Sequence, residues 1–199
     1  DGRAYGGGGG GYSGDRGGGG HGRGGSWNTR ANDAFSPGPR NPRSELDIFG
    51  PPREKDEKTT GINFDKYDDI PVEFSGKDVP EAAKDFDELK MPEQLRLNVE
   101  LAGYDRPTPI QKSTIPVSLT GRDLMACAQT GSGKTAAFLL PSITRLLAMD
   151  RPPPGRKAAP LALVLSPTRE LTIQIHNEAR KFCYLSGVRP VVCYGGADI

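Results

Sequence analysis

A short segment near the middle of the chain, residues 128–135, constrains the fold more strongly than any other feature. It reads Ala-Gln-Thr-Gly-Ser-Gly-Lys-Thr, it follows an apolar run at 124–127, and apolar residues at helical spacing come after it. A buried strand, a glycine-rich turn and a helix that begins with Lys-Thr are the context of a phosphate-binding P-loop. In such a turn main-chain N–H groups point at phosphate oxygens, and the helix N-terminus adds its positive end. The segment therefore predicts nucleotide binding.

The residues of this loop have separate expected roles. Lys134 would reach the β- and γ-phosphates, and the hydroxyl of Thr135 would bind Mg²⁺. Ala128 stands where glycine is usual, which is tolerable if the backbone there keeps a negative φ. The predicted nucleotide-binding residues of the loop are Ala128, Gln129, Thr130, Gly131, Ser132, Gly133, Lys134 and Thr135. The plain alternative is a glycine-serine turn that happens to precede a helix.

Cysteine content and hydropathy exclude several classes of protein. The chain has 199 residues, three cysteines and two histidines. No pair of cysteines has zinc-ligand spacing, so we expect free, buried thiols in a reducing compartment. No apolar run is long enough to span a membrane, and the N-terminus lacks a signal-peptide core. We therefore expect a soluble protein without a membrane partner in the cytoplasm, with the nucleus and RNA granules as further locations.

Composition divides the chain into a tail and a folded part. Residues 1–26 are dominated by glycine, with arginine and tyrosine between the glycines, and cannot bury enough apolar surface to fold. We expect a disordered Gly/Arg-rich and charged tail at 1–60 that contacts RNA weakly or is a passive linker. Within it, residues 44–49 could form one helical turn that docks on a partner or collapses locally. An extended segment at 61–85 and a folded domain at 86–199 should follow.

The folded part alternates strand-like and helical patterns, which predicts an α/β domain with a parallel sheet covered by helices. The expected strands are 123–128, 161–165 and 190–194, and the expected helices begin near Pro92, Thr108, Lys134 and Thr168. Pro116 should end or kink its helix, and Pro141 should bend the next one. Ligands of such sheets bind beyond the carboxyl ends of the strands. Three polar or glycine-rich turns fall there, which predicts one functional surface.

Four motifs in order resemble those of the DEAD-box RNA helicases. Residues 103–111 resemble the Q motif, with the isolated upstream aromatic residue present as Phe86, and 128–135 have that family's form of Walker A. Residues 167–171 resemble motif Ia, and 195–196 resemble the GG motif. The resemblance implies a truncated first RecA-like lobe within 86–199, ATP and Mg²⁺ as cofactors, and sequence-nonspecific RNA as the partner. The implied activity is ATP-dependent RNA unwinding or remodelling.

The same resemblance assigns roles to single residues. Gln111 would read adenine with its amide, Tyr104 would stack on the base, Arg106 would help to hold it, and Phe86 would close the pocket. Ordinary core packing is the alternative for both aromatic residues. The residues implied to face RNA are Pro167, Thr168, Arg169, Glu170, Gly195 and Gly196. For Arg169 and Glu170 the alternative is a surface ion pair.

Residues 61–73 and the Arg-Gly tail resemble the Belle branch of that family and, more distantly, Vasa. This branch implies a role in translation initiation, with initiation factors as partners. Thr172 stands where alanine is usual, and we expect its hydroxyl to bond a carbonyl one turn back. The chain stops before the Asp-Glu-Ala-Asp motif and the second lobe, so we expect a fragment that binds ATP without useful turnover.

Two other functions remain open from the sequence. A different P-loop NTPase, such as a DNA helicase or a nucleotide kinase, explains residues 128–135 but leaves 107–111 and 167–171 as coincidences. A non-catalytic RNA-binding or condensate-forming protein would depend on residues 1–30 and carry a degenerate nucleotide fold.

Overall fold

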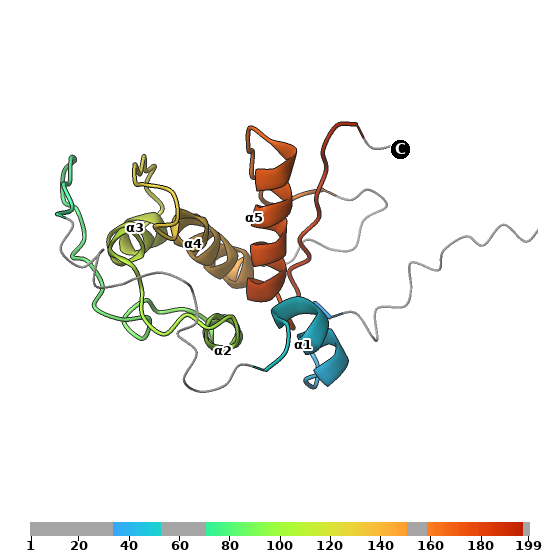
Figure 1. Cartoon of the computed structure of the whole chain (residues 1–199). Coiled ribbons are helices and arrows are strands. Elements are labelled where there is room, and N and C mark those ends of the chain that lie inside the picture. The colour runs from blue at the N-terminus through green and yellow to red at the C-terminus, as the bar shows by residue number, and fades with distance from the viewer. Residues whose placement is uncertain (1–33, 53–70, 151–158, 197–199) are drawn as a thin grey trace, which may run out of the picture. The chain divides into compact units, whose positions relative to one another are not determined.

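The computed structural model describes residues 34–52, 71–150 and 159–196, and five α-helices lie in these ranges (Figure 1). They are α1 (Pro42–Phe49), α2 (Glu93–Leu101), α3 (Pro109–Leu119), α4 (Lys134–Ala148) and α5 (Arg169–Phe182). The helix starts expected near Pro92, Thr108, Lys134 and Thr168 are confirmed. The predictions for residues 1–33 and 53–70 lie outside the described residues. None of the helices in the described ranges has the length and apolar character needed to cross a membrane.

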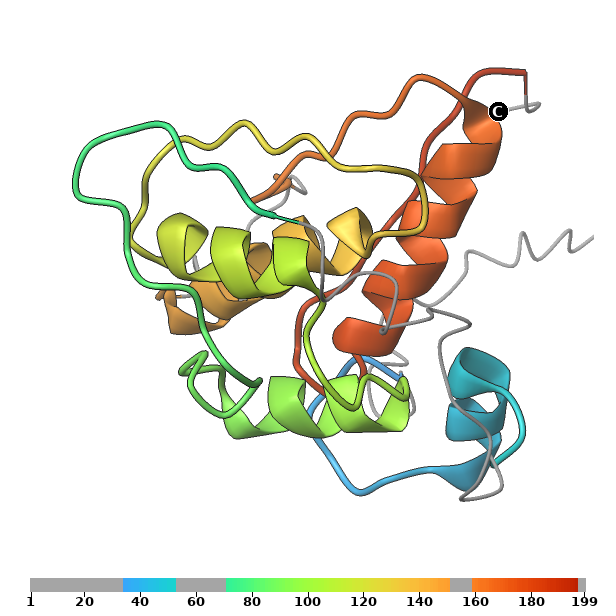
Figure 2. The same cartoon turned by 60° about the vertical axis from the view of Figure 1, so that its left-hand side comes forward.

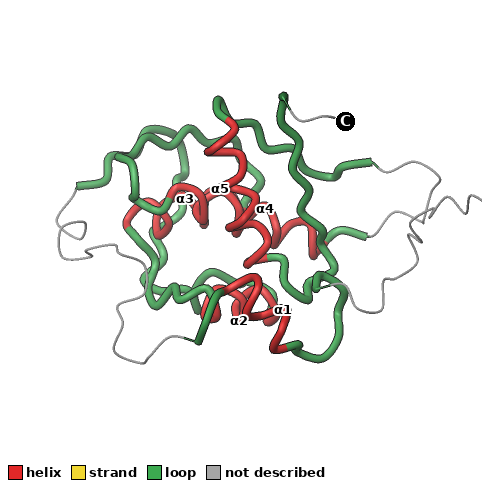
Figure 3. The backbone as a smooth tube through the Cα atoms, turned by 45° about the vertical axis from the view of Figure 1, so that its right-hand side comes forward, coloured by secondary structure: helices red, strands yellow, loops and turns green. Residues whose placement is uncertain are grey.

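The predicted parallel sheet is not found in the part of the chain that the structure describes, which contains no strand (Figure 3). The three expected strands are extended segments, and the one before α4 passes over α3 (Figure 2). Their apolar side chains face solvent, with Met125 89%, Leu165 83% and Val191 80% exposed. A strand needs a neighbouring backbone about 4.8 Å away to pair with, and an apolar run cannot supply that partner by itself. The helical half of the α/β prediction is confirmed, and the sheet is not.

The apolar core lies where α2, α3, α4 and the end of α5 meet. Leu95, Ile115, Leu140 and Phe182, one from each of these helices, are all 0% exposed and belong to one cluster. Burial of such a side chain contributes about 1.5–3 kcal/mol to stability. This shared cluster fixes α4, which begins in the P-loop, against α3 and α5.

Neither internal proline ends its helix. Pro116 lacks the N–H that would bond the carbonyl of Lys112, four residues earlier. The N–H of Ala83 donates to that carbonyl instead, at 2.9 Å. The unpaired carbonyl in α3 thus becomes an attachment point for the segment before α2. The next helix, α4, likewise continues through Pro141 to Ala148.

The C-terminal end of α5 is held by a buried amide from α2. Asn98 is 0% exposed, and its Nδ2 donates to the carbonyls of Phe182 at 2.9 Å and Tyr184 at 2.7 Å. Its Oδ1 accepts from Nε2 of Gln94 at 3.0 Å. Carbonyls at a helix end have no partner within the helix, and Asn98 supplies one to the Phe182 carbonyl. The Tyr184 carbonyl accepts from Asn98 and also from Nε2 of Gln94, at 3.3 Å.

Part of the predicted tail folds against the same end of α5. The expected helical turn at 44–49 is confirmed as part of α1, and it docks on this chain itself. The hydroxyl of Tyr184 accepts from the Asn41 N–H at 3.0 Å and donates to Glu45 at 3.2 Å. Ile48 packs on Tyr184 in a second small cluster. Helix α1 is therefore attached to α5 by both polar and apolar contacts.

All three cysteines are free thiols, as the sequence suggests. Cys183 is buried, and burial raises the pKa of its thiol to about 12, so it stays protonated and unreactive. The expected burial is wrong for Cys127 and Cys193, which are exposed because the segments that carry them are not paired in a sheet.

We predict that Asn98→Ala lowers the free energy of unfolding by about 1–3 kcal/mol, because the Phe182 carbonyl loses its bond to Asn98 and the Tyr184 carbonyl keeps only its bond to Gln94. Urea denaturation measures this change. Asn177→Ala, on the exposed side of α5, is the matched control and should change stability by less than about 0.5 kcal/mol. Equal effects of the two substitutions would contradict the role given to Asn98.

Candidate nucleotide-binding site

The loop before α4 has the backbone that its glycines predict. Gly131 has φ +80° and Gly133, which caps α4, has φ +90°. Glycine adopts such values without strain, whereas other residues rarely do. Ala128 is not among the described residues with positive φ, which meets the condition for alanine at the first position. The loop therefore curls as a P-loop should.

The side chain of Lys134 stabilises the curled loop by hydrogen bonds to its main chain. Its Nζ donates to the carbonyl of Ala128 at 2.6 Å and to that of Gln129 at 2.7 Å. An ammonium group carries three donors and no acceptor, so phosphate oxygens can replace these neutral carbonyls as stronger, charged partners. The arrangement places the Lys134 ammonium group where a nucleotide phosphate could accept its hydrogen bonds.

Gln111 links the start of α3 to the end of the loop. The side chain is 0% exposed. Its Oε1 accepts from the Thr108 N–H at 3.0 Å, and its Nε2 donates to the Gly133 carbonyl at 3.0 Å. A Cβ at Gly133 would lie 2.5 Å from Nε2, closer than real contacts allow. Glycine at 133 is thus required by the close approach of Gln111 as well as by its positive φ.

Two buried hydroxyls beside this link have no partner among the described residues. Ser132 Oγ and Thr108 Oγ1 are both buried and unpaired there. A buried polar group without a partner costs about 1–3 kcal/mol, which a ligand can recover. Ser132 also lines a cavity of about 790 Å³ between α3 and the segment that leads into the loop. These features fit a phosphate group or its bound water.

A magnesium ion at this site would have few protein ligands. Thr135, in the first turn of α4, is half-buried and supplies one hydroxyl. The described residues contain no group of three His, Cys, Asp or Glu side chains that could hold a metal. Mg²⁺ commonly keeps several waters and binds through substrate phosphates. Thr135 with phosphate and water therefore fits the ion.

The residues expected around adenine have core contacts in this structure. The ring of Tyr104 lies 6.5 Å from that of Phe86 and 5.6 Å from that of Phe182, each edge-on. Its hydroxyl donates to Glu178 at 3.1 Å, and burial together with this carboxylate raises the pKa of Tyr104. Arg106 is exposed nearby in sequence. The roles of these side chains toward a base stay predictions.

The residues expected to face RNA gather at the start of α5. Thr168 caps the helix by accepting from the Leu171 N–H at 3.3 Å. The Thr172 hydroxyl donates to the Thr168 carbonyl at 2.8 Å, which confirms the bond expected one turn back. The guanidinium carbon of Arg169 lies 4.4 Å from the ring centroid of Tyr194, so the motif Ia-like segment lies beside the exposed Gly195 and Gly196.

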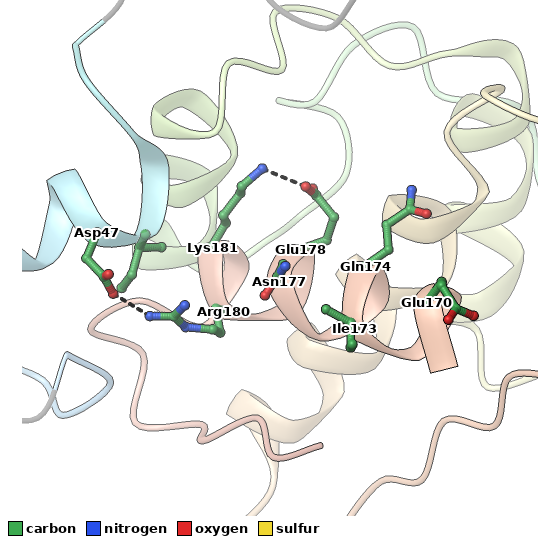
Figure 4. A pocket seen from close by; sticks show the side chains of 9 residues that line it. Asp47, Glu170, Ile173, Gln174, Asn177, Glu178, Arg180 and Lys181 are labelled. Atoms are coloured by element: carbon green, nitrogen blue, oxygen red, sulfur yellow. Dashed lines mark hydrogen bonds and ion pairs between the residues drawn. The ribbon is translucent and has the colours of Figure 1, made fainter. Parts of the chain in front are cut away.

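A groove of about 550 Å³ is lined by residues of α5 and α1 (Figure 4). Arg180 pairs there with Asp47 of α1 at 2.6 Å, and Lys181 pairs with Glu178 at 2.6 Å. Glu170 lies at the other end of the groove. Within the described ranges Glu170 and Arg169 form no ion pair. The surface ion pair considered as an alternative for these two residues is therefore not found there.

Three contacts of the site escaped the sequence reasoning. Thr108 and Gln111 have the spacing of a capping box, a local signal that predicts the bond between them. The apolar pattern predicts Tyr194 only as a strand residue, although an aromatic residue before Gly-Gly is a candidate platform for a basic side chain. The bond between Tyr104 and Glu178 joins residues far apart in sequence, and no local pattern predicts it.

Comparisons with known proteins agree with the geometry of the loop. Residues 108–199 match the DEAD/DEAH box helicase family. The structure is similar to the crystal structure of the RNA-helicase Prp28 from Chaetomium thermophilum bound to ADP, with 42% sequence identity and a TM-score of 0.56. The match covers 62% of this chain and 30% of the Prp28 chain, so the present chain corresponds to less than a third of that protein.

We predict that Gly133→Ala weakens ADP binding by about 5- to 150-fold. Strain at this positive φ amounts to about 1–3 kcal/mol, so the free loop should relax away from it, and ADP binding would have to restore the strained backbone. Gly38→Ala is the matched control, because its nearest contact would be 3.9 Å away and its φ is ordinary. Calorimetric titration with ADP measures both variants. Unchanged affinity in Gly133→Ala would contradict the close packing described for the loop.

The clash itself is tested in a second background. In Gln111→Ala the amide that an added Cβ would strike is gone. We expect Gly133→Ala to cost less there, because only the φ strain and the contact with Thr108 remain. An equal cost in both backgrounds would show that the Gln111 amide does not set the requirement for glycine.

Proposed function

We propose, from the premise that residues 108–199 form part of a DEAD/DEAH box helicase domain, that the protein is an RNA-dependent ATPase that unwinds or remodels RNA. Helices α2 to α5 would then be the helical part of a first RecA-like lobe. The match covers 30% of the Prp28 chain, so we propose this activity for the whole protein and not for the present residues alone.

The observation that carries this proposal is the bond from Gln111 to the Gly133 carbonyl. The side-chain amide has two donor hydrogens and two acceptor lone pairs, and the bonds to Thr108 and Gly133 use one of each. The second donor and acceptor match the complementary groups on an adenine edge. Since Gln111 is 0% exposed, a base reaches it only when the side chains that cover it move. Base recognition and loop geometry would therefore depend on one side chain.

The phosphate end of ATP would be bound by Lys134 and the loop. The ammonium of Lys134 would exchange the Ala128 and Gln129 carbonyls for β- and γ-phosphate oxygens, and the loop N–H groups would surround the same oxygens. Bound Mg²⁺, held in part by Thr135, supplies charge neutralisation during phosphoryl transfer. These residues bind and orient the phosphates, and we expect the carboxylate that positions water to come from the Asp-Glu-Ala-Asp motif of the family.

RNA would lie against the start of α5 and the neighbouring Gly-Gly turn. Arg169 offers a guanidinium group, and Thr168 and the exposed Gly195 and Gly196 offer hydroxyl and main-chain groups. Such groups contact phosphates and sugars and carry no base information. The binding would accordingly be independent of sequence and sensitive to salt.

We also propose the Belle-like branch, and with it a role in translation initiation in the cytoplasm with initiation factors as partners. The sequence at 61–73 and the Arg-Gly tail support this branch. Co-purification of initiation factors with the full-length protein, retained after RNase treatment, tests it. Loss of every such factor after RNase would leave no direct protein partner and would contradict the branch assignment.

We predict that the full-length protein hydrolyses ATP in preference to the other nucleoside triphosphates, and that single-stranded RNA stimulates hydrolysis. Lys134→Ala should lower RNA-stimulated kcat by about 100-fold or more, because the phosphates lose their cation. Lys84→Ala, at an exposed position remote from the loop in sequence, is the control and should leave kcat unchanged. A coupled phosphate-release assay measures each rate.

Two outcomes would contradict the proposal. Equal use of all four triphosphates would argue against base recognition by Gln111. Stimulation by DNA as strong as that by RNA would favour another class of P-loop NTPase.

A further inference from the structure

Arg169 and Tyr194 form a stacked pair at the edge of the proposed RNA-binding surface. The guanidinium carbon of Arg169, the first residue of α5, lies 4.4 Å from the centroid of the Tyr194 ring. Arg169 is exposed, Tyr194 is half-buried, and Gly195 follows directly in an exposed turn. Within residues 34–52, 71–150 and 159–196, Arg169 has no carboxylate partner. Among these residues, the contact that positions its guanidinium group is the one with the Tyr194 ring.

The chemistry of a guanidinium group makes this contact consequential. The group is flat, and its N–H donors lie in its plane. When its face rests on a ring, the attraction fixes that plane while the donors at the edge stay available. Those donors match two oxygens of one phosphate group. An unsupported arginine must lose the freedom of several rotatable bonds before it can bind in the same way.

The backbone around the pair is also fixed. The Ser166 and Thr172 hydroxyls lie 2.5 Å apart, and the Thr172 hydroxyl also donates to the Thr168 carbonyl at 2.8 Å. Ser166, which precedes α5, is thus joined to the first turn of the helix, the turn that carries Arg169. Glu170, the nearest acidic residue in sequence, lines the groove toward α1 (Figure 4), whereas Arg169 and Tyr194 are not among the residues that line it.

We propose that Tyr194 is a positioning residue that presents the Arg169 guanidinium to the RNA backbone. This inference rests on the proposed function, because it deepens the RNA contact assigned there to residues 167–170 and 195–196. The aromatic ring, and not the phenolic hydroxyl, performs this role, because the guanidinium lies over the ring centroid. Phenylalanine at position 194 should therefore retain this role, whereas an aliphatic residue should lose it.

The test is a double-mutant cycle on RNA affinity in the full-length protein. Fluorescence anisotropy with a labelled single-stranded RNA and a non-hydrolysable ATP analogue measures the dissociation constant. We expect Tyr194→Leu to weaken binding about 3- to 10-fold and Tyr194→Phe to stay within about 2-fold of the unsubstituted protein. We expect Arg169→Ala to weaken binding, and Tyr194→Leu to cause no further loss in that background.

Salt dependence supplies a readout that a merely structural role of Tyr194 would not move. The slope of log affinity against log salt counts the phosphate contacts made by cations. If Tyr194→Leu releases Arg169 from its phosphate, the slope should fall by about 1, as in Arg169→Ala itself. ADP affinity should stay unchanged in every variant, which shows that the domain is folded.

The outcomes separate this inference from the proposed function. If Tyr194→Leu weakens binding equally with and without Arg169, or leaves RNA affinity unchanged while Arg169→Ala lowers it, the positioning role is overturned. If the unsubstituted protein has no RNA affinity, both the proposed function and this role are overturned.

Discussion

The buried amide of Gln111 is the interaction on which the rest of the site depends. It closes the start of α3 through Thr108 and holds the last loop residue before α4 through the Gly133 carbonyl. Both partners of this amide are main-chain groups, the Thr108 N–H and the Gly133 carbonyl. The packing of α3 on α4 in the core, where Ile115 and Leu140 are fully buried, also holds these two helices together. The P-loop has its shape because a neighbouring helix supports it.

The start of α5, where we propose RNA contacts, is on a helix that is held at its opposite end. Asn98 satisfies the carbonyls at the C-terminal end, and α1 attaches there through Tyr184. Because Phe182 shares one core with Leu140 of α4, the nucleotide loop and the proposed RNA-binding turn extend from helices that pack on common side chains. A ligand that favoured one arrangement of this core would bias the other site, and this would couple nucleotide and RNA binding if both proposed sites are real.

The sequence predicts those features that depend on neighbouring residues. Pro109 at the first helical position, Thr168 as an N-cap, and the glycines at 131 and 133 each announce a local geometry, and the structure has it. Contacts between distant segments were beyond such reasoning. Nothing near Pro116 predicts that Ala83 takes the carbonyl left free in α3.

The predicted sheet is also a feature that depends on contacts between distant segments. Apolar runs such as 161–165 have the composition of buried strands, but pairing is a property of two segments, and in the described residues these runs stay exposed. The folding of residues 34–50 onto α5 was likewise hidden, because its anchor is one tyrosine hydroxyl more than a hundred residues away. The backbone of the loop at 128–135 was therefore predictable from its own residues, whereas the contacts that support the loop and the absence of the sheet from the described residues were not.

A crystal structure of the full-length protein with ADP tests the central claim most directly. The account predicts that Gln111 Nε2 stays within hydrogen-bonding distance of the Gly133 carbonyl, while the Lys134 ammonium leaves the Ala128 and Gln129 carbonyls for the β-phosphate. A Gln111 side chain turned away from Gly133, with the loop still curled around the phosphates, would contradict it.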